Sequence, residues 1–324
     1  MQKILITGGA GYIGTSLTTL ALKKGFKVIA LDNLKHSKTQ FIKQFIKNKH
    51  YTFFKCDIND LNKFEKILKK EKVNIIVHLA GIVGDPASKL QKKLTKLTNV
   101  VSSKKIFLLS EKYNVDKFIF SSTCSNYGIV NSKLLANENS KLKPLSLYAK
   151  TKVDFENFMI EQSKKIKMHL VIMRFATVFG VSDRMRFDLT INQFTRDLYF
   201  NKKLNIFGQN TWRPYCHVKD VSRAIIYSID SIRKINIFNV GNSKQNYSKK
   251  IVLDAIGKFI PLKNLTYSKQ EISDKRDYKV NFTKINKQLK FKTKYNLNFG
   301  IKEVIVFLKR KRKDNLYSKI YSNT

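Results

Sequence analysis

A tyrosine and a lysine in the middle of the chain have the spacing of a proton-transfer pair. Tyr148 and Lys152 lie four positions apart in a stretch predicted to be helical, 147–165, and residues four apart share one face of a helix. A free tyrosine titrates at about pH 10, and a neighbouring ammonium group favours the phenolate and lowers that pKa. Tyr148 could then take a hydroxyl proton while hydride leaves the same carbon for a nicotinamide cofactor. The pair alone is a weak signal, because the chain is rich in both residue types.

The turn after the first apolar run is rich in glycine. Gly8, Gly11 and Gly14 follow a predicted strand and precede a predicted amphipathic helix. Glycines there permit a tight turn and let the backbone approach a pyrophosphate group. The helix would point its free N–H groups and its positive dipole end at the phosphates. Together with the Tyr–Lys pair, this turn predicts an enzyme that uses a nicotinamide dinucleotide to oxidise and reduce a hydroxyl-bearing carbon.

Asp32 ends the second predicted strand, at the distance from the glycines that suits a ribose-binding carboxylate. Such a carboxylate accepts hydrogen bonds from the adenosine ribose hydroxyls and repels a 2′-phosphate. The sequence therefore favours NAD over NADP. The alternative is that Asp32 is an ordinary cap or turn residue.

Short apolar runs alternate with helical patterns through the first half of the chain, and this alternation predicts the fold class. It is typical of an α/β, doubly wound, Rossmann-type parallel sheet with helices on both faces. The predicted strands are 4–6, 28–31, 53–54, 75–77, 118–120 and 170–173, and the predicted helices are 12–24, 60–71, 89–113 and 147–165.

The rhythm changes after residue 174, which predicts a division into two lobes. We expect an NAD-binding domain over 1–173, to which 213–240 returns, with a strand and helix within 215–230. We expect a smaller mixed α/β substrate lobe over 174–212 and 241–308, above the carboxyl edge of the sheet. The basic tail, 309–324, is expected to be frayed.

This order of motifs resembles the extended short-chain dehydrogenase/reductase family, and more narrowly its nucleotide-sugar epimerase and dehydratase branch, which is UDP-glucose 4-epimerase-like. The resemblance extends to about residue 308. It implies that Thr123, Tyr148 and Lys152 are catalytic and that Thr123 bonds the reacting sugar oxygen. The cofactor-binding residues that it implies, together with those above, are Gly8, Gly11, Tyr12, Ile13, Gly14, Asp32, Asn33, Asp57, Ile58, Leu79, Ala80, Gly81, Asn99, Ser121, Tyr148, Lys152 and Phe175.

The same resemblance implies a substrate side in the second half of the chain. Arg213 would grip a diphosphate, for which a guanidinium fork suits better than an ammonium group. The stretch 184–189 would form a lid or wall over the sugar nucleotide. The substrate-binding residues implied are Thr123, Thr177, Asn192, Arg213 and Asp274. His78 is expected to be a buried histidine without chemistry.

The residues after Thr123 bear on the reaction. Dehydratases and decarboxylases of the family resemble one another in carrying acidic residues at the two positions after this threonine. This chain has Cys124 and Ser125 there. The resemblance then implies epimerisation, at C4 of a UDP-hexose, through a transient ketone with NAD regenerated. Two alternatives stay open: a nucleotide-sugar 4-ketoreductase or dehydratase, and a non-catalytic RNA-binding protein on the same fold.

The composition bears on partners and location. The formal charge is +40, but lysines are spread along the whole chain, so we expect a compositional bias and no nucleic-acid partner; such a surface would still attract an anionic nucleotide sugar. No apolar run reaches the roughly 18 residues of a membrane span. The strand near Met1 leaves no room for a signal peptide, and three scattered cysteines have no metal-like spacing. We expect a cytoplasmic homodimer, joined through helices 89–113 and 147–165.

Overall fold

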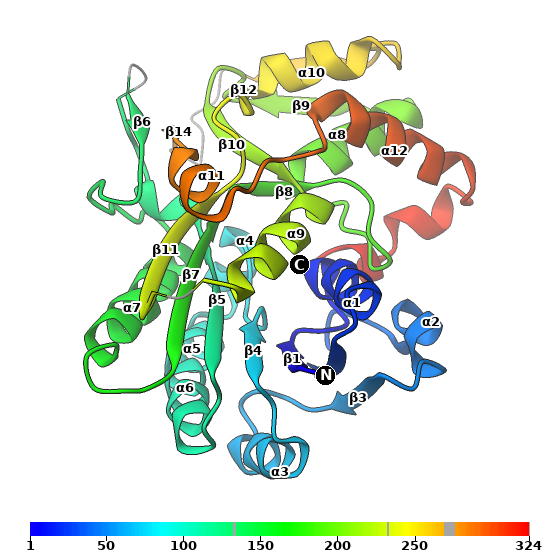
Figure 1. Ribbon diagram of the computed structural model, residues 1–324. Coiled ribbons are helices and arrows are strands. Elements are labelled where there is room, and N and C mark those ends of the chain that lie inside the picture. Colours follow the sequence, from blue (N-terminus) through cyan, green and yellow to red (C-terminus); the bar gives the residue numbers. More distant parts are fainter. Residues whose placement is uncertain (132–133, 232, 269–275, 324) are drawn as a thin grey trace.

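The chain folds around a parallel sheet of seven strands in the order β11-β7-β5-β4-β1-β2-β3 (Figure 1). The computed structural model describes residues 1–131, 134–231, 233–268 and 276–323. All the strand pairs of this sheet are parallel, as the repeated strand–helix units predict. Its strands are β1 (Lys3–Thr7), β2 (Lys27–Asp32), β3 (Tyr51–Lys55), β4 (Ile75–His78), β5 (Lys117–Thr123), β7 (His169–Phe175) and β11 (Ile235–Val240).

Helices cover both faces of this sheet, so the predicted doubly wound fold class is confirmed. Ile4 and Ile6 of β1 join a buried cluster with side chains of α1 (Tyr12–Lys23) and α9 (Val218–Ile229). Leu5, which points to the opposite face, joins a second cluster. Its other members come from α3 (Leu61–Glu71), α6 (Ser103–Lys112) and α7 (Leu147–Gln162).

The long helix predicted over 89–113 is instead a broken helical segment. It consists of α4 (Asp85–Leu90), α5 (Lys92–Lys96), a π-helical stretch η2 (Leu97–Ser102) and α6. The buried Asn99 of η2 bonds the backbone of Ile82 and the hydroxyl of Thr151. These polar contacts tie η2 to the loop after β4 and to α7. The spacing of apolar residues, from which one long helix was predicted, carries no information about them. π-Helical turns of this kind often occur at functional sites.

A smaller lobe stands over the carboxyl edge of the sheet (Figure 1). Its three-stranded sheet has the order β12-β10-β8, and two further strand pairs are β13-β9 and β14-β6. Its strands are β6 (Leu135–Ala136), β8 (Thr177–Phe179), β9 (Leu204–Phe207), β10 (Trp212–His217), β12 (Asn246–Ser248), β13 (Leu265–Ser268) and β14 (Lys279–Val280). The longer helices here are α8 (Thr190–Tyr199), α10 (Lys249–Gly257) and α12 (Leu297–Lys309), whereas α11 (Thr283–Leu289) contacts β11 of the main sheet. The short helices η1 (Thr39–Phe41) and α2 (Lys43–Ile46) lie between β2 and β3 of the main domain, and η3 (Cys124–Tyr127) follows β5.

The strand expected within 215–230 does not return to the main sheet. β10 pairs with β8 and β12 instead, and its Tyr215 is buried in the apolar cluster of the small lobe beside Phe179. The following helix, α9, packs on α1 as a helix of the main domain, and β11 is the strand that joins the main sheet beside β7. Side-chain burial in the small lobe therefore decides the partners of β10. The domain boundaries themselves stay a prediction.

The tail expected to be frayed is folded. After the basic run, η4 (Asp314–Tyr317) and η5 (Lys319–Tyr321) turn back against the body of the molecule. Leu316 is fully buried in a cluster with Met185 and Leu308. Contacts of Leu316, Tyr317 and Tyr321 hold this segment against the body of the molecule, and the charge of the preceding run obscured them in the sequence. No helix in the described part of the chain is long and apolar enough to cross a bilayer.

Candidate functional site

A cavity of about 1170 Å³ opens where the carboxyl ends of the central strands meet the small lobe. It brings together the predicted glycines, the second-strand carboxylate, the Tyr–Lys pair and residues of the substrate side. The predicted residues that line it are Gly8, Gly11, Tyr12, Ile13, Gly14, Asp32, Asn33, Asp57, Ile58, Leu79, Ala80, Gly81, Ser121, Thr123, Tyr148, Lys152, Phe175, Thr177 and Arg213. Asn99 and Asn192 are not among its lining residues, and Asp274 lies outside the described residues.

The glycine turn is a cradle that side chains would fill. Gly8 has φ +72°, and a Cβ there would lie 3.0 Å from the backbone nitrogen of Ala80. A Cβ on Gly14 would lie 2.3 Å from the carbonyl oxygen of Gly8. Gly11 precedes α1 without a side-chain capping bond, so the first N–H groups of the helix are left to a ligand. This arrangement fits the pyrophosphate of a dinucleotide.

Asp32 lies beside this cradle with its carboxylate held by the backbone. Its two oxygens accept hydrogen bonds from the nitrogens of Leu34 (2.8 Å) and Ala10 (3.2 Å). Burial raises the pKa of Asp32, and the two backbone bonds oppose that rise. The side-chain amide of Asn33 donates to Asp57 at 2.8 Å. A fixed carboxylate at this place suits the hydroxyls of an adenosine ribose.

Thr123, Tyr148 and Lys152 converge from the end of β5 and the first turns of α7. Ser146 caps α7 by accepting a hydrogen bond from the nitrogen of Ala149 (3.2 Å), which fixes the helix start just before Tyr148. Tyr148 hydrogen-bonds Thr123. The buried Lys152 amino group donates to the carbonyl of Ser121 at 2.8 Å and lies 5.8 Å from the Tyr148 ring centroid.

The lowering of the Tyr148 pKa by Lys152 that the sequence suggests is not found. Burial raises the pKa of Tyr148 to about 12, and Arg186, Arg276 and the Thr123 hydrogen bond oppose that rise. Burial also lowers the pKa of Lys152 to about 7. Desolvation disfavours the charged form of both groups, so the tyrosine is a proton donor in the free protein.

His78 is a buried, uncharged histidine, as the sequence suggests. Its ring nitrogens hydrogen-bond the hydroxyls of Thr7 (2.9 Å) and Ser103 (3.0 Å). Burial, with a smaller contribution from Lys152, lowers the pKa of His78 from 6.5 to about 3. The residue supports β1 and β4 beneath the cavity and is not on its wall.

This burial predicts acid sensitivity. Between pH 6.5 and about pH 3, the unfolded chain carries a proton on His78 that the folded chain excludes. The free energy of unfolding should therefore fall by about 1.4 kcal/mol per pH unit from this group, and no such loss should occur above pH 6.5. When the free energy of unfolding in urea is plotted against pH across this range, the slope for His78→Asn should be smaller than that of the parent protein by the contribution of one proton. His50→Gln, in the turn before β3, should keep the parent slope; equal slopes for all three proteins would contradict the prediction.

A buried ionic network lies beneath Thr123 and Tyr148. The guanidinium of Arg174 makes a bidentate ion pair with Glu156, with a shortest distance of 2.7 Å. Asn126 donates to the same carboxylate at 2.9 Å. The hydroxyl of Ser122 also bonds it. The network fixes η3, the turn that follows Thr123, against α7 and β7.

Asn192 and Tyr12 support the cavity wall from behind. The Asn192 side chain is buried and accepts a hydrogen bond from the nitrogen of Gly180 (3.0 Å) while donating to the carbonyl of Arg186 (3.0 Å). The Tyr12 hydroxyl donates to the carbonyl of Gly180 at 2.6 Å. Both side chains therefore hold the loop that follows β8. The substrate contact expected of Asn192 would need this support to be broken.

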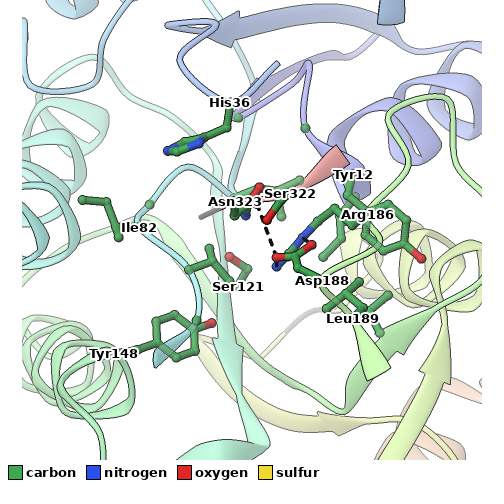
Figure 2. A pocket seen from close by; sticks show the side chains of 18 of the residues that line it. Tyr12, His36, Ile82, Ser121, Tyr148, Arg186, Asp188, Leu189, Ser322 and Asn323 are labelled. Atoms are coloured by element: carbon green, nitrogen blue, oxygen red, sulfur yellow. Dashed lines mark hydrogen bonds and ion pairs between the residues drawn. The ribbon is translucent and has the colours of Figure 1, made fainter. Parts of the chain in front are cut away.

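Sequence reasoning missed an ion pair across the cavity. Arg276 contacts Asp85 at 2.8 Å and donates to the hydroxyl of Ser125 at 2.9 Å. All three residues line the cavity, and the charge of Asp85 acts on Tyr148. The signal available in the sequence was an acid followed by Pro86 at a helix start. Arg186, paired with Asp188 at 2.6 Å, projects into the same cavity (Figure 2).

A site built in this way places the protein in the class of short-chain dehydrogenase/reductase enzymes, in which a helical tyrosine works beside a dinucleotide bound at the sheet edge. The chain belongs to the NAD dependent epimerase/dehydratase family, whose model matches residues 4–241. It is therefore an enzyme, and its cofactor is NAD.

Similar proteins act on nucleotide sugars. A UDP-glucuronate 4-epimerase of Thermodesulfobacterium geofontis is 26% identical over 94% of this chain and 95% of its own length. A dTDP-D-glucose 4,6-dehydratase of Dictyostelium discoideum is 30% identical over 78% of this chain and 62% of its own length. A UDP-glucose 4-epimerase of Thermotoga maritima, solved with UDP-glucose, has a TM-score of 0.87 and 25% identity over 95% of this chain and 99% of that one.

Proposed function

We propose that the protein is an NAD-dependent nucleotide-sugar epimerase that inverts C4 of a UDP-hexose. NAD, when bound, accepts hydride from a sugar carbon and returns it. Tyr148 takes the proton of the sugar hydroxyl and gives it back, while Thr123 bonds the same oxygen. Because Tyr148 is protonated in the free protein, it must lose its own proton before it can take that of the sugar hydroxyl. Lys152, anchored on the Ser121 carbonyl, would favour this loss in its ammonium form. Arg213, on the cavity wall, takes the diphosphate.

One observation carries the choice of epimerisation. The two residues after Thr123 offer no acid for removing water or carbon dioxide. Cys124 is fully buried, and its thiol donates to the carbonyl of Arg174 at 3.2 Å. Burial also raises the pKa of Cys124 well above its usual range. Ser125 is held by Arg276. Inversion through a ketone needs no group beyond Thr123, Tyr148, Lys152 and the bound cofactor, so this pair of residues supports epimerisation over dehydration.

The test is a substrate panel. Purified protein with NAD is incubated with UDP-, GDP-, CDP- and dTDP-hexoses, and the products are followed by NMR. We expect a C4 stereoisomer of a UDP-hexose, with no net formation of NADH and no loss of water. Stoichiometric use of NADH would reject epimerisation in favour of a ketoreductase.

A dehydratase of the same family is the second candidate, and Asp85 favours it. Its carboxylate lines the cavity close enough to Tyr148 to raise the pKa of that residue. The Oδ1 atom of Asp85 is buried and makes no hydrogen bond to any described residue. If the panel shows loss of water, Asp85→Asn should abolish it; if the protein is an epimerase, the same variant should keep the inversion.

We also propose a cytoplasmic homodimer. Its support for location is that Cys56, Cys124 and Cys216 are buried free thiols, as expected in a reducing compartment. Its support for assembly is a row of exposed apolar side chains on neighbouring helices: Leu97, Val101, Leu108 and Ile160. Exposed apolar patches of this kind mark protein contacts.

The assembly can be tested with one charge. Val101→Glu should turn the dimer into a monomer at micromolar concentration, because a carboxylate in an apolar interface loses its hydration without a partner. Light scattering after gel filtration measures the mass. Val306→Glu on α12, where the valine is equally exposed, should leave the dimer intact. A monomeric parent protein would contradict the proposal outright.

A further inference from the structure

The segment 314–323 is anchored to the small lobe at its first half. Leu316 is buried beside Met185 and Leu308. The Tyr317 hydroxyl donates to Asp197 at 3.0 Å, and the Arg196 guanidinium lies 4.0 Å from the Tyr317 ring centroid. These contacts place the segment along α8 and direct its second half toward the cavity.

The second half of the segment joins the two lobes at the cavity. The Tyr321 ring packs against Phe41 of the main domain, at 6.3 Å, and against Phe187 of the loop after β8, at 5.8 Å. The nitrogen of Phe187 donates to the Tyr321 carbonyl at 2.8 Å, and the nitrogen of Asn323 donates to Asp188 at 3.3 Å. Figure 2 shows Ser322 and Asn323 between His36 and the Arg186–Asp188 pair. The segment thus lines the same cavity as Asp32 and Tyr148.

Arg184 ties this segment to the loop that follows Asp32. Its side chain is 99% buried and lines the cavity, and the charges of Asp188 and Asp32 act on it, but its hydrogen bonds to the described residues do not go to these carboxylates. It donates instead to two backbone carbonyls, of His36 at 2.8 Å and of Ser322 at 3.0 Å. Burial lowers the pKa of Arg184 to about 10. The carboxylates of Asp188 and Asp32 offset only part of the cost of burying this guanidinium, and an anionic ligand in the adjoining cavity would offset more of it.

We propose that residues 316–323, joined to the main domain through Arg184, form a strap that is part of the dinucleotide site and slows release of NAD. A dinucleotide that contacts both Asp32 and Tyr148 runs along the cavity wall that the strap supplies. Its exit then requires the strap to separate from Phe41 and from the His36 carbonyl. The proposal rests on the family's cofactor and is independent of the sugar and of the reaction at C4.

The test measures cofactor binding without turnover. Tyr321→Ala should raise the dissociation rate and the Kd of NAD by about tenfold, since the ring contacts that hold the strap closed are lost. Stopped-flow fluorescence and equilibrium dialysis give the two constants. The Kd of UDP should stay within about twofold. Tyr267→Ala, which removes an exposed tyrosine from β13, is the matched control and should change neither constant.

Two further measurements protect the test against a misfolded variant. Arg184→Met nearly keeps the side-chain volume but removes the hydrogen bonds to the carbonyls of His36 and Ser322. It should weaken NAD binding as Tyr321→Ala does. In the unaltered protein, saturation with NAD should slow amide hydrogen exchange in 316–323. Unchanged NAD binding in folded variants, or exchange in 316–323 that NAD does not alter, would overturn the proposal. Tighter NAD binding in Tyr321→Ala would overturn it too, because the segment would then compete for the cofactor's space.

Discussion

Tyr148→Phe should lower kcat by about 10²–10⁴, the range that a positioned acid–base group supplies. The phenol is the group that exchanges the sugar proton, and phenylalanine keeps the ring while removing the hydroxyl that bonds Thr123. Binding of NAD should be nearly unchanged, because the glycine cradle and Asp32 are untouched. Initial rates on the substrate that the panel identifies, with equilibrium dialysis of NAD, measure both quantities.

Tyr227→Phe is the matched control for that change. Tyr227 is exposed on α9, and loss of its hydroxyl should leave kcat within about twofold. If Tyr148→Phe retained the parent kcat, Tyr148 would not be the proton carrier, and the epimerase proposal would lose its central residue.

Lys152→Met should lower kcat/KM by about 10²-fold, and it should also weaken the binding of NAD. Methionine keeps the length of the side chain but removes the amino group that bonds the Ser121 carbonyl and faces the Tyr148 ring. The variant should fold, because Glu156, the acid whose charge acts on Lys152, keeps its ion pair with Arg174. Loss of the lysine therefore leaves no unpaired carboxylate in the core.

The readout that separates the two roles of Lys152 is the division between NAD binding and kcat. A weaker Kd for NAD with a lowered kcat at saturating NAD means that the lysine serves both cofactor and tyrosine. Lys150→Met, an exposed lysine of the same helix, should alter neither value. Unchanged kcat and Kd in Lys152→Met would remove the lysine from the site.

The glycine turn, the Tyr–Lys pair and the strands of the main domain could be predicted from the sequence, because each depends on residues that lie close together in the chain. The glycine spacing from Gly8 to Gly14 determines a turn, and the Tyr148–Lys152 spacing determines a shared helix face. Strands buried on both faces read as apolar runs, so six of the seven strands of the main sheet were located. The missed strand was β11, because Ile235–Val240 alternates with asparagine and does not form one apolar run.

The electrostatics of the site could not be read from residue types. Lys152 was expected to lower the pKa of Tyr148, but burial raises that pKa and makes Lys152 itself easy to deprotonate. How deeply a group is buried depends on the packing of every neighbouring element, and so does the balance between desolvation and Coulomb attraction.

The sequence by itself determined the fold class and the preference for NAD, and it predicted the dinucleotide turn and the Tyr148–Lys152 pair, since each is encoded in a strand end or in a helical spacing; the place of Thr123 came from the resemblance. Only the tertiary structure decided that β10 pairs with β8 and β12, that Asp85 meets Arg276, and that Arg184 bonds Ser322. Arg184 and Ser322 are 138 positions apart, and such contacts arise from the packing of whole elements, which leaves no periodic trace in the chain.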